Sequence, residues 1–217
     1  DDGAFSESTI EKLSIPESLT ELGKNWCSYS EKLYNVVIDS KNQHFKMVNE
    51  KLMVGKSRLN SSFDVILFAC RNIGEFVEIP NDIIRIAPYS FNRCKKMKML
   101  AFSESSSLKI IDDFAFYECS ALKKITAIPH SVVKIGYQSF MLSNNLRSIE
   151  FLSDDLHIGD SCFSMCSLLL LVSCPNIHKI KIDYGAFYGS KKGIILLVNP
   201  GPEFHSDGCK LKLAKKV

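Results

Sequence analysis

The chain has 217 residues, of which 46% are apolar, and its 27 Lys and Arg against 24 Asp and Glu give a formal net charge of +3. This balance excludes a disordered chain and gives no general attraction to nucleic acid or an anionic membrane. The longest apolar runs cover about five residues, against the roughly twenty of a membrane-spanning helix. The start, Asp1-Asp2-Gly3, has no signal-peptide pattern, so a leader is either missing or already removed.

The first predicted element is a repeat unit over residues 15–38. It opens with Ile15-Pro16 and closes with an alternating segment, residues 33–38, that is typical of a short β-strand. Leu22, Cys27 and Ser30 lie between them, at the spacing that an apolar, a core and a small residue keep in the later copies. We therefore expect one strand from this unit.

Residues 39–78 are predicted to form an insertion, because Cys27 and Phe91, the equivalent core positions of the first two repeats, lie 64 positions apart. Residues 45–48 and 51–54 alternate around Asn49-Glu50, which is typical of a β-hairpin. Residues 64–68 are a candidate third strand, and the repeat pattern resumes at residues 76–80.

Five further repeats follow, at about 79–102, 104–127, 128–151, 152–174 and 175–198. A phenylalanine recurs at intervals of 25, 24, 23 and 24 positions, as Phe91, Phe116, Phe140, Phe163 and Phe187. Five residues before each lies an isoleucine, namely Ile86, Ile111, Ile135, Ile158 and Ile182. Three residues after each comes a small residue, namely Cys94, Cys119, Ser143, Cys166 and Ser190. A strand-like segment then closes each unit.

This periodicity predicts a solenoid, because a unit of about 24 residues cannot bury its apolar face alone, whereas stacked units share one core. The strands should form a parallel sheet, with short turns or helical segments on the opposite side. Alternation directs Leu100, Phe102, Ile149 and Phe151 inward, and each phenylalanine ring should stack on the ring one repeat away. Residues 199–217 are expected to be a C-terminal cap or tail, so residues 1–217 form a single domain.

The repeat resembles the BspA-like leucine-rich repeat, whose unit reads roughly Ile-Pro-x-Ser-Val-x-x-Ile-Gly-x-x-Ala-Phe-x-x-Cys-x-x-Leu-x-x-Ile. Residues 111–122 and 128–136 match it most closely, and the likeness extends from residue 15 to about residue 198. Ser143 and Ser190 depart from it by replacing the cysteine, and an extra residue near Ala127 leaves the register of that strand ambiguous. The resemblance implies a leucine-rich repeat solenoid with a curved parallel sheet and a β-hairpin insertion.

The cysteines and histidines of this chain are better explained by packing than by metal binding or catalysis. Cys94, Cys119 and Cys166 share one repeat position and are interpreted as small core residues, because parallel side-chain directions disfavour a disulfide. Cys162 and Cys166 lack the further ligands that a zinc site needs, and the five histidines are scattered. No nucleotide-binding or nucleophile motif is present. We therefore predict no catalytic residue, no metal and no cofactor.

The candidate binding surface is the outward, concave face of the predicted sheet. Alternation assigns to it the residues Met99, Lys124, Thr126, Ser148, Glu150, Leu171, Ile195 and Leu197. The middle of this row is mixed in polarity, whereas its last members are apolar and favour coverage by the chain's own tail or by a partner. A second candidate is an edge for a polyanion, formed by lysine pairs at 95–96, 123–124 and 191–192 and by the lysines of residues 210–216.

The resemblance implies a non-enzymatic surface or secreted adhesin of bacteria or protist parasites that binds a host or extracellular-matrix protein. A glycosaminoglycan- or carbohydrate-binding module that uses the lysine edge is the alternative, and an intracellular interaction scaffold differs only in location. Nucleic acid is not an expected partner, and no transmembrane segment is expected. Salt separates the first two hypotheses, since polyanion binding weakens as ionic strength rises.

Overall fold

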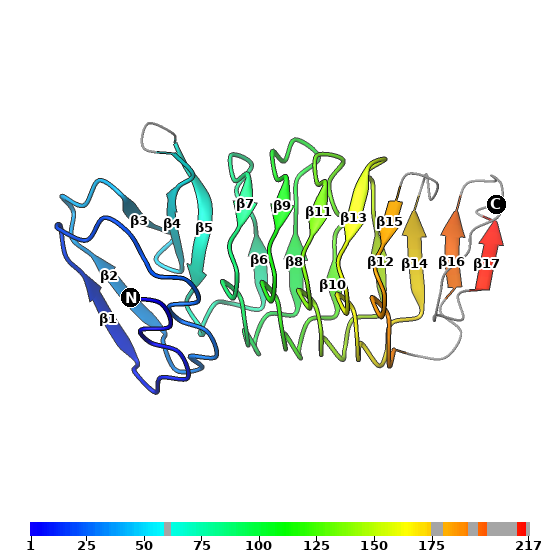
Figure 1. Ribbon diagram of the computed structural model, residues 1–217, viewed down its shortest axis with the longest axis horizontal. Helices are drawn as coiled ribbons and strands as arrows, with labels where there is room; N and C mark the ends of the chain where they lie inside the picture. The colour runs from blue at the N-terminus through cyan, green and yellow to red at the C-terminus, as the bar shows by residue number, and fades with distance from the viewer. Residues whose placement is uncertain (59–61, 175–179, 191–194, 199–211, 216–217) are drawn as a thin grey trace.

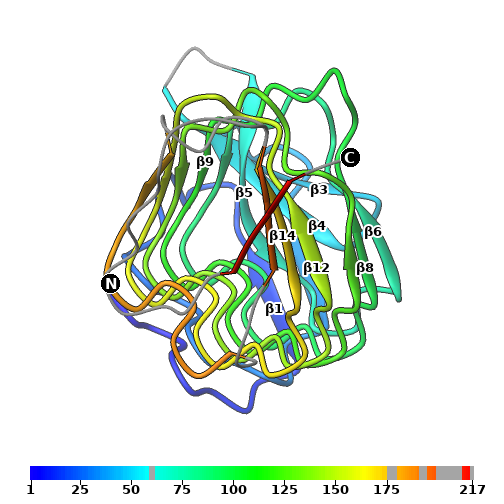
Figure 2. The same ribbon diagram turned by 90° about the vertical axis from the view of Figure 1, so that its right-hand side faces the viewer.

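The computed structural model describes residues 1–58, 62–174, 180–190, 195–198 and 212–215. The chain winds into a row of stacked coils, with the N-terminal residues at one end and the C-terminal strand at the other (Figure 1). Viewed along the row, two walls of strands and a wall of turns enclose the core (Figure 2). No helix occurs within the described ranges, so the side opposite the sheets is built from turns alone.

The first wall contains the repeat strands that the sequence predicts, together with one strand at each end that it does not predict. Its members are β1 (Lys12–Ile15), β2 (Asn35–Ile38), β6 (Phe76–Glu78), β8 (Met99–Ala101), β10 (Lys124–Ile125), β12 (Ser148–Glu150), β14 (Leu171–Cys174), β16 (Ile195–Val198) and β17 (Lys212–Lys215). They pair in parallel as β1-β2, β6-β8-β10 and β12-β14-β16-β17, and a bridge between Ile128 and Phe151 lies between the last two groups. The predicted parallel sheet is confirmed.

The second wall is a sheet of which the sequence analysis predicted only the hairpin and its third strand. Its members are β3 (Phe45–Val48), β4 (Leu52–Lys56), β5 (Phe63–Ala69), β7 (Arg85–Ile86), β9 (Ile110–Ile111), β11 (Lys134–Ile135), β13 (Leu156–Ile158) and β15 (Ile180–Ile182). They form one eight-stranded sheet in the order β15-β13-β11-β9-β7-β5-β4-β3. The recurring isoleucines lie in its short strands, which have only two or three residues. A strand of this length is too short for the alternation of inward and outward side chains to be recognised in the sequence.

The insertion extends the second wall. β3 and β4 pair antiparallel, with Asn49 and Glu50 at positive φ in the connection, so the predicted hairpin is confirmed. β5 adds the expected third strand, antiparallel to β4 and parallel to β7. The hairpin therefore continues the sheet edge of the solenoid and does not stand apart from it.

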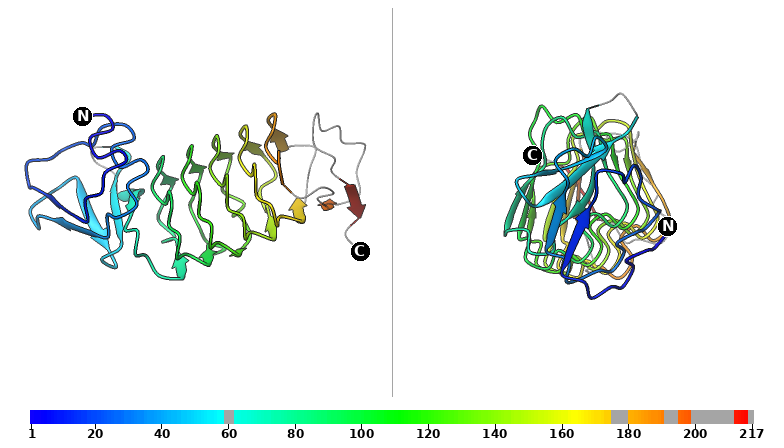
Figure 3. Two further views of the ribbon diagram at one scale, coloured as in Figure 1. Left: turned by 90° about the horizontal axis from the view of Figure 1, so that it is seen from below. Right: turned by 90° about the vertical axis from the view of Figure 1, so that its left-hand side faces the viewer.

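Residues 1–15 form a further coil that the sequence analysis did not include. Phe5 N–H donates to Trp26 O over 2.7 Å, Glu7 N–H donates to Ser28 O over 2.8 Å, and β1 pairs with β2. This coil lies outermost at the N-terminal end of the row (Figure 3). Ala4-Phe5 and Ser8 keep the Ala-Phe-x-x-small spacing, which was the signal available in the sequence.

The turn wall is held by hydrogen bonds that run along the row. Residues two before and two after each phenylalanine have positive φ, as Phe114 at 57° and Glu118 at 56° show. This conformation, which costs a non-glycine residue roughly 1 kcal/mol or more, turns alternate N–H groups toward the next coil. Phe114 donates to Tyr137 O and Glu118 to Met141 O, over 2.9 and 2.8 Å. The axial hydrogen bonds offset the strain.

Candidate functional site

The strand pairing sets the side chains of the proposed face in rows. Met99 pairs with Phe76 on one side and Lys124 on the other, and Ser148 pairs with Leu171. Lys124 and Ser148 are exposed, whereas Met99 and Leu171 are partly buried. The predicted residues of β8, β10, β12 and β14 thus occupy consecutive strands of one wall.

The second outward row is less exposed than the alternation suggests. Thr126 and Glu150 are partly buried, and Ala101 and Ser173, which belong to the same row, are buried. Ala101 and Ser173 have small side chains, so neighbouring side chains can cover them although they point outward from the strand. The surface that a partner could contact therefore consists of the row of Met99, Lys124, Ser148 and Leu171, together with Thr126 and Glu150.

Ile195 and Leu197 continue the two rows onto β16. By backbone pairing Ile195 follows Leu171 and Leu197 follows Ser173. Their side chains lie outside the described residues, so the proposed apolar end of the face stays a prediction. β17 pairs in parallel with β16, which places a further strand of this chain next to that end.

Thr126 resolves the ambiguous register near Ala127. Lys124 and Ile125 pair with Met99 and Leu100, but Phe102 N–H donates to the Thr126 side chain, over 2.8 Å to Oγ1. The chain regains the pattern at Ile128, which bridges to Phe151. Ala127 is therefore the extra residue, and the Thr126 hydroxyl replaces a ladder bond where the strand is interrupted.

One lysine of the predicted edge, Lys95, is paired with neighbouring carboxylates. Its Nζ lies 3.3 Å from Glu31 and 3.7 Å from Glu118. Lys98, which lies outside the predicted pairs, also has a partner, because its Nζ lies 2.6 Å from Glu75 Oε1. Lys191 and Lys192 fall outside the described residues. The pairing reduces the local positive potential that a polyanion would need.

The recurring thiols are core groups. Cys119 Sγ donates to Phe91 O and Cys166 Sγ to Phe140 O, each over 3.2 Å, so the column ties one coil to the preceding one. Burial raises the pKa of Cys166 to about 12, which keeps that thiol protonated at neutral pH. The described cysteines are all free, and within the described ranges no group of three or more His, Cys, Asp or Glu could hold a metal ion.

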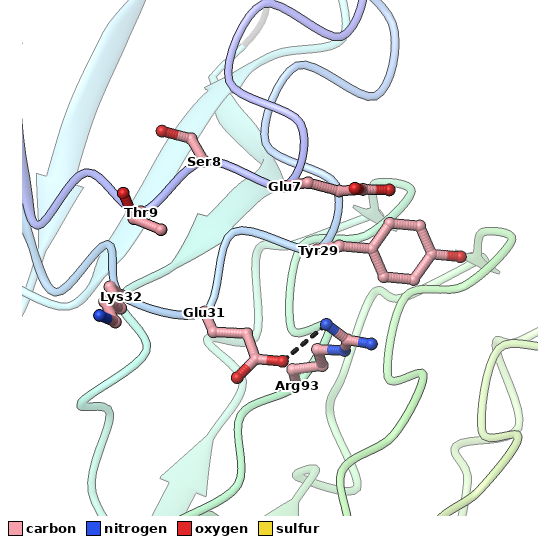
Figure 4. A pocket seen from close by; sticks show the side chains of 7 residues that line it. All are labelled: Glu7, Ser8, Thr9, Tyr29, Glu31, Lys32 and Arg93. Atoms are coloured by element: carbon pink, nitrogen blue, oxygen red, sulfur yellow. Dashed lines mark hydrogen bonds and ion pairs between the residues drawn. The ribbon is translucent and has the colours of Figure 1, made fainter.

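A depression of about 450 Å³ lies on the turn wall, where the N-terminal coils meet the Phe91 coil (Figure 4). Arg93 is one of its lining residues, and its Nη1 lies 2.6 Å from Glu31 while its Nε lies 2.8 Å from Glu118. The guanidinium also covers the Tyr29 ring, 5.0 Å from its centroid. Because Arg93 is paired with a carboxylate on each side, it fastens its own coil to both neighbouring coils and is not poised for acid–base catalysis. No pattern in the sequence indicates this depression, since the coil that the sequence analysis did not include contributes Glu7, Ser8 and Thr9.

Among the described residues, no helix is long and apolar enough to cross a bilayer. A family model, the BspA type leucine rich repeat region, matches residues 1–52 and 62–193 in six copies. No curated protein matches the chain.

Several solved bacterial structures share the fold. A leucine-rich cell surface protein of Faecalibacterium prausnitzii superposes with a TM-score of 0.69 at 21% identity, covering 79% of this chain and 44% of that one. A leucine-rich repeat protein of Eubacterium ventriosum gives 0.71 at 20% identity, over 95% and 64%. The pneumococcal vaccine antigen PcpA gives 0.65 at 18% identity, over 99% and 58%. The chain thus spans less than two thirds of each, and identities this low establish the fold alone.

Proposed function

The chain belongs to the BspA-type leucine-rich repeat family, and from this premise we propose that it is a non-enzymatic binding protein that docks a protein partner on the outward face of its first wall. The observation that carries the proposal is the row formed by Phe76, Met99, Lys124, Ser148 and Leu171. It is mixed in polarity and spans consecutive strands, which suits a protein partner better than a small molecule.

We further propose that the protein works at the cell surface or after secretion and that its partner is a host or extracellular-matrix protein. Support comes from the family and from the description of the F. prausnitzii structure as a cell surface protein. An intracellular scaffold is the competing location. Labelling of intact cells with an antibody to this chain tests the location, and staining only after permeabilisation would contradict it.

The binding face is tested with a charge-reversal double variant, Lys124→Glu with Glu150→Lys. We expect it to melt like the wild type and to bind a panel of immobilised, purified extracellular-matrix proteins at least about tenfold more weakly. Lys109→Glu, on the approach to β9 in the second wall, is the matched control and should bind normally. Full binding by the double variant would exclude the middle of the face, and loss in a folded Leu197→Asp variant would move the site toward β16.

A heparin column tests the alternative, a polyanion-binding lysine edge. Because Lys95 of this edge is paired with Glu31 and Glu118, we expect the protein to elute from heparin at low salt. Retention that a few hundred millimolar salt abolishes, together with no binding to the protein panel, would favour the glycosaminoglycan function instead.

A further inference from the structure

The turn wall carries a column of side chains three residues before four of the core phenylalanines. In these successive coils its members alternate between acid and aromatic, as Asp113, Tyr137, Asp160 and Tyr184, of which Asp160 is partly buried and the other three are exposed. The residue after each has positive φ, so the four turns share one backbone conformation and project these side chains from equivalent points. The column is therefore a regular feature of the surface.

The tyrosines of this column repeat every second coil. The core rings behind them mark the advance of the solenoid, with Phe140 and Phe163 centroids 5.2 Å apart and Phe163 and Phe187 centroids 5.4 Å apart. Two coils therefore advance by about 10 Å, close to twice the ordinary spacing of neighbouring strands. This is about the length over which a β-1,4-linked pyranose chain, which turns over at each linkage, repeats.

Both tyrosines expose part of their ring, and each follows the acid of the preceding coil in the column. Tyr137 is 41% exposed and packs T-shaped against Phe114, with 5.3 Å between ring centroids, and Tyr184 is 76% exposed. Asp113 Oδ1 accepts the N–H of Tyr137 over 2.8 Å, and Asp160 Oδ1 accepts the hydroxyl of Ser161 over 2.6 Å. One oxygen of each carboxylate therefore accepts a hydrogen bond within the protein, and the other oxygen is the candidate acceptor for a ligand hydroxyl.

We propose that this column binds a neutral, linear β-1,4-linked polysaccharide. One sugar ring stacks its C–H face on Tyr137, the ring two residues along the polymer stacks on Tyr184, and the hydroxyls between them donate to Asp160. An aromatic platform with a polar group beside it fits the two-sided character of a pyranose. The carboxylates Asp113 and Asp160 repel sulfated or uronic-acid chains, so the site differs in ligand and in location from the lysine edge.

Titration calorimetry with cellohexaose, using the whole chain, tests the proposal. Tyr137→Ala and Tyr184→Ala should each weaken binding about tenfold while the melting temperature stays unchanged. Tyr188→Ala is the matched control, because Tyr188 is 67% exposed on the same coil as Tyr184 but lies in another column. Maltohexaose, which has the same sugars in α-1,4 linkage and a helical shape, should bind at least about tenfold more weakly than cellohexaose.

Salt and the first-wall variant complete the test. Binding should be insensitive to ionic strength, because neutral sugars carry no charge to screen, and the Lys124→Glu, Glu150→Lys variant should bind cellohexaose normally. No binding of cellohexaose by the wild type, or an equal loss in Tyr188→Ala, would overturn the site. Either result leaves the protein-binding face of the first wall untouched, so the two proposals fail separately.

Discussion

Ser143 differs in its hydrogen bonding from the other residues that lie three positions after a core phenylalanine. Cys119 and Cys166 reach a carbonyl oxygen of the preceding coil, and Ser190 does so with its Oγ, over 2.8 Å to Phe163 O. Ser143 Oγ is buried and has no hydrogen-bond partner in the described part of the chain. A buried hydroxyl without a hydrogen-bond partner lowers the free energy of unfolding by about 1–3 kcal/mol. A thiol loses less on burial, and its longer bond to Cβ brings the sulfur nearer to the carbonyl of the preceding coil.

We expect Ser143→Cys to raise the free energy of unfolding by about 1 kcal/mol, because the thiol can donate to Phe116 O as its neighbours donate one coil away. Urea denaturation followed by circular dichroism measures the change. Ser190→Cys is the control and should bring no gain, since the hydroxyl there is already satisfied. A lower urea midpoint for Ser143→Cys would show that the site cannot accommodate the larger atom.

Gly136 is required by the close approach of the preceding coil. A Cβ built on it would lie 2.5 Å from the Asp113 nitrogen and 2.7 Å from the Asp112 carbonyl carbon, which are backbone atoms. We expect Gly136→Ala to cost about 1–3 kcal/mol through this overlap, seen as a lower melting temperature. Gly74→Ala, where the nearest atom is 3.9 Å away, should be nearly neutral, and equal costs would contradict the argument.

At the scale of elements, the phenylalanine column is the spine of the core. Neighbouring rings from Phe91 to Phe187 lie 4.7–5.4 Å apart with interplanar angles of 7–17°, so the predicted stacking is confirmed. Each of the three inner rings contacts a stacked ring on either side, and Phe116 is fully buried. Stacking within the column therefore stabilises the contact between each coil and the next.

Phe116→Ala should lower the free energy of unfolding by roughly 3–5 kcal/mol, because it opens a cavity between two stacked rings that cannot close. Equilibrium urea denaturation provides the measurement. Phe76→Ala is the matched control, because Phe76 is 57% exposed on β6 and its removal should cost less than about 1 kcal/mol. An unchanged midpoint for Phe116→Ala would contradict the stacked-column account.

At the scale of the whole molecule, the chain has two cores that meet at Arg71. One core lies behind β1, β2 and the hairpin, and the other runs through the regular coils. The Arg71 guanidinium is buried between them, where it donates from Nε to Ser30 O over 2.9 Å and from Nη1 to Ser90 O over 3.0 Å. It also covers the Phe68 ring. This side chain joins coils that the insertion separates in sequence.

Arg71→Met should cost about 2–3 kcal/mol, because it leaves buried carbonyl groups without a donor. It should also uncouple the two cores, so that amides of residues 1–56 exchange hydrogen faster than those of the regular coils. Arg85→Met, which removes a half-exposed guanidinium paired with Asp112, is the control and should cost less than about 1 kcal/mol. Uniform exchange across Arg71→Met would show that the junction does not depend on this residue.

The sequence by itself determined the repeat, the first wall, the hairpin and the phenylalanine column. Each depends on a periodic pattern of burial, and such a pattern is visible whenever a column of side chains must stay apolar along the stack. The same pattern gave the outward residues of β8 to β14, because alternation within a strand follows directly from the pleat.

Only the tertiary structure decided the second wall, the left-handed turns, the Arg71 junction and the column of Tyr137 and Tyr184. Beyond the insertion, the second wall has strands of two or three residues, too short for a period to appear, and most of the left-handed positions carry residues other than glycine. The Arg71 junction and the tyrosine column bring together side chains from different coils. Their proximity follows from how the coils stack and not from a fixed spacing in the sequence. A contact between coils becomes defined only once the number of residues in every intervening turn and insertion is fixed in space.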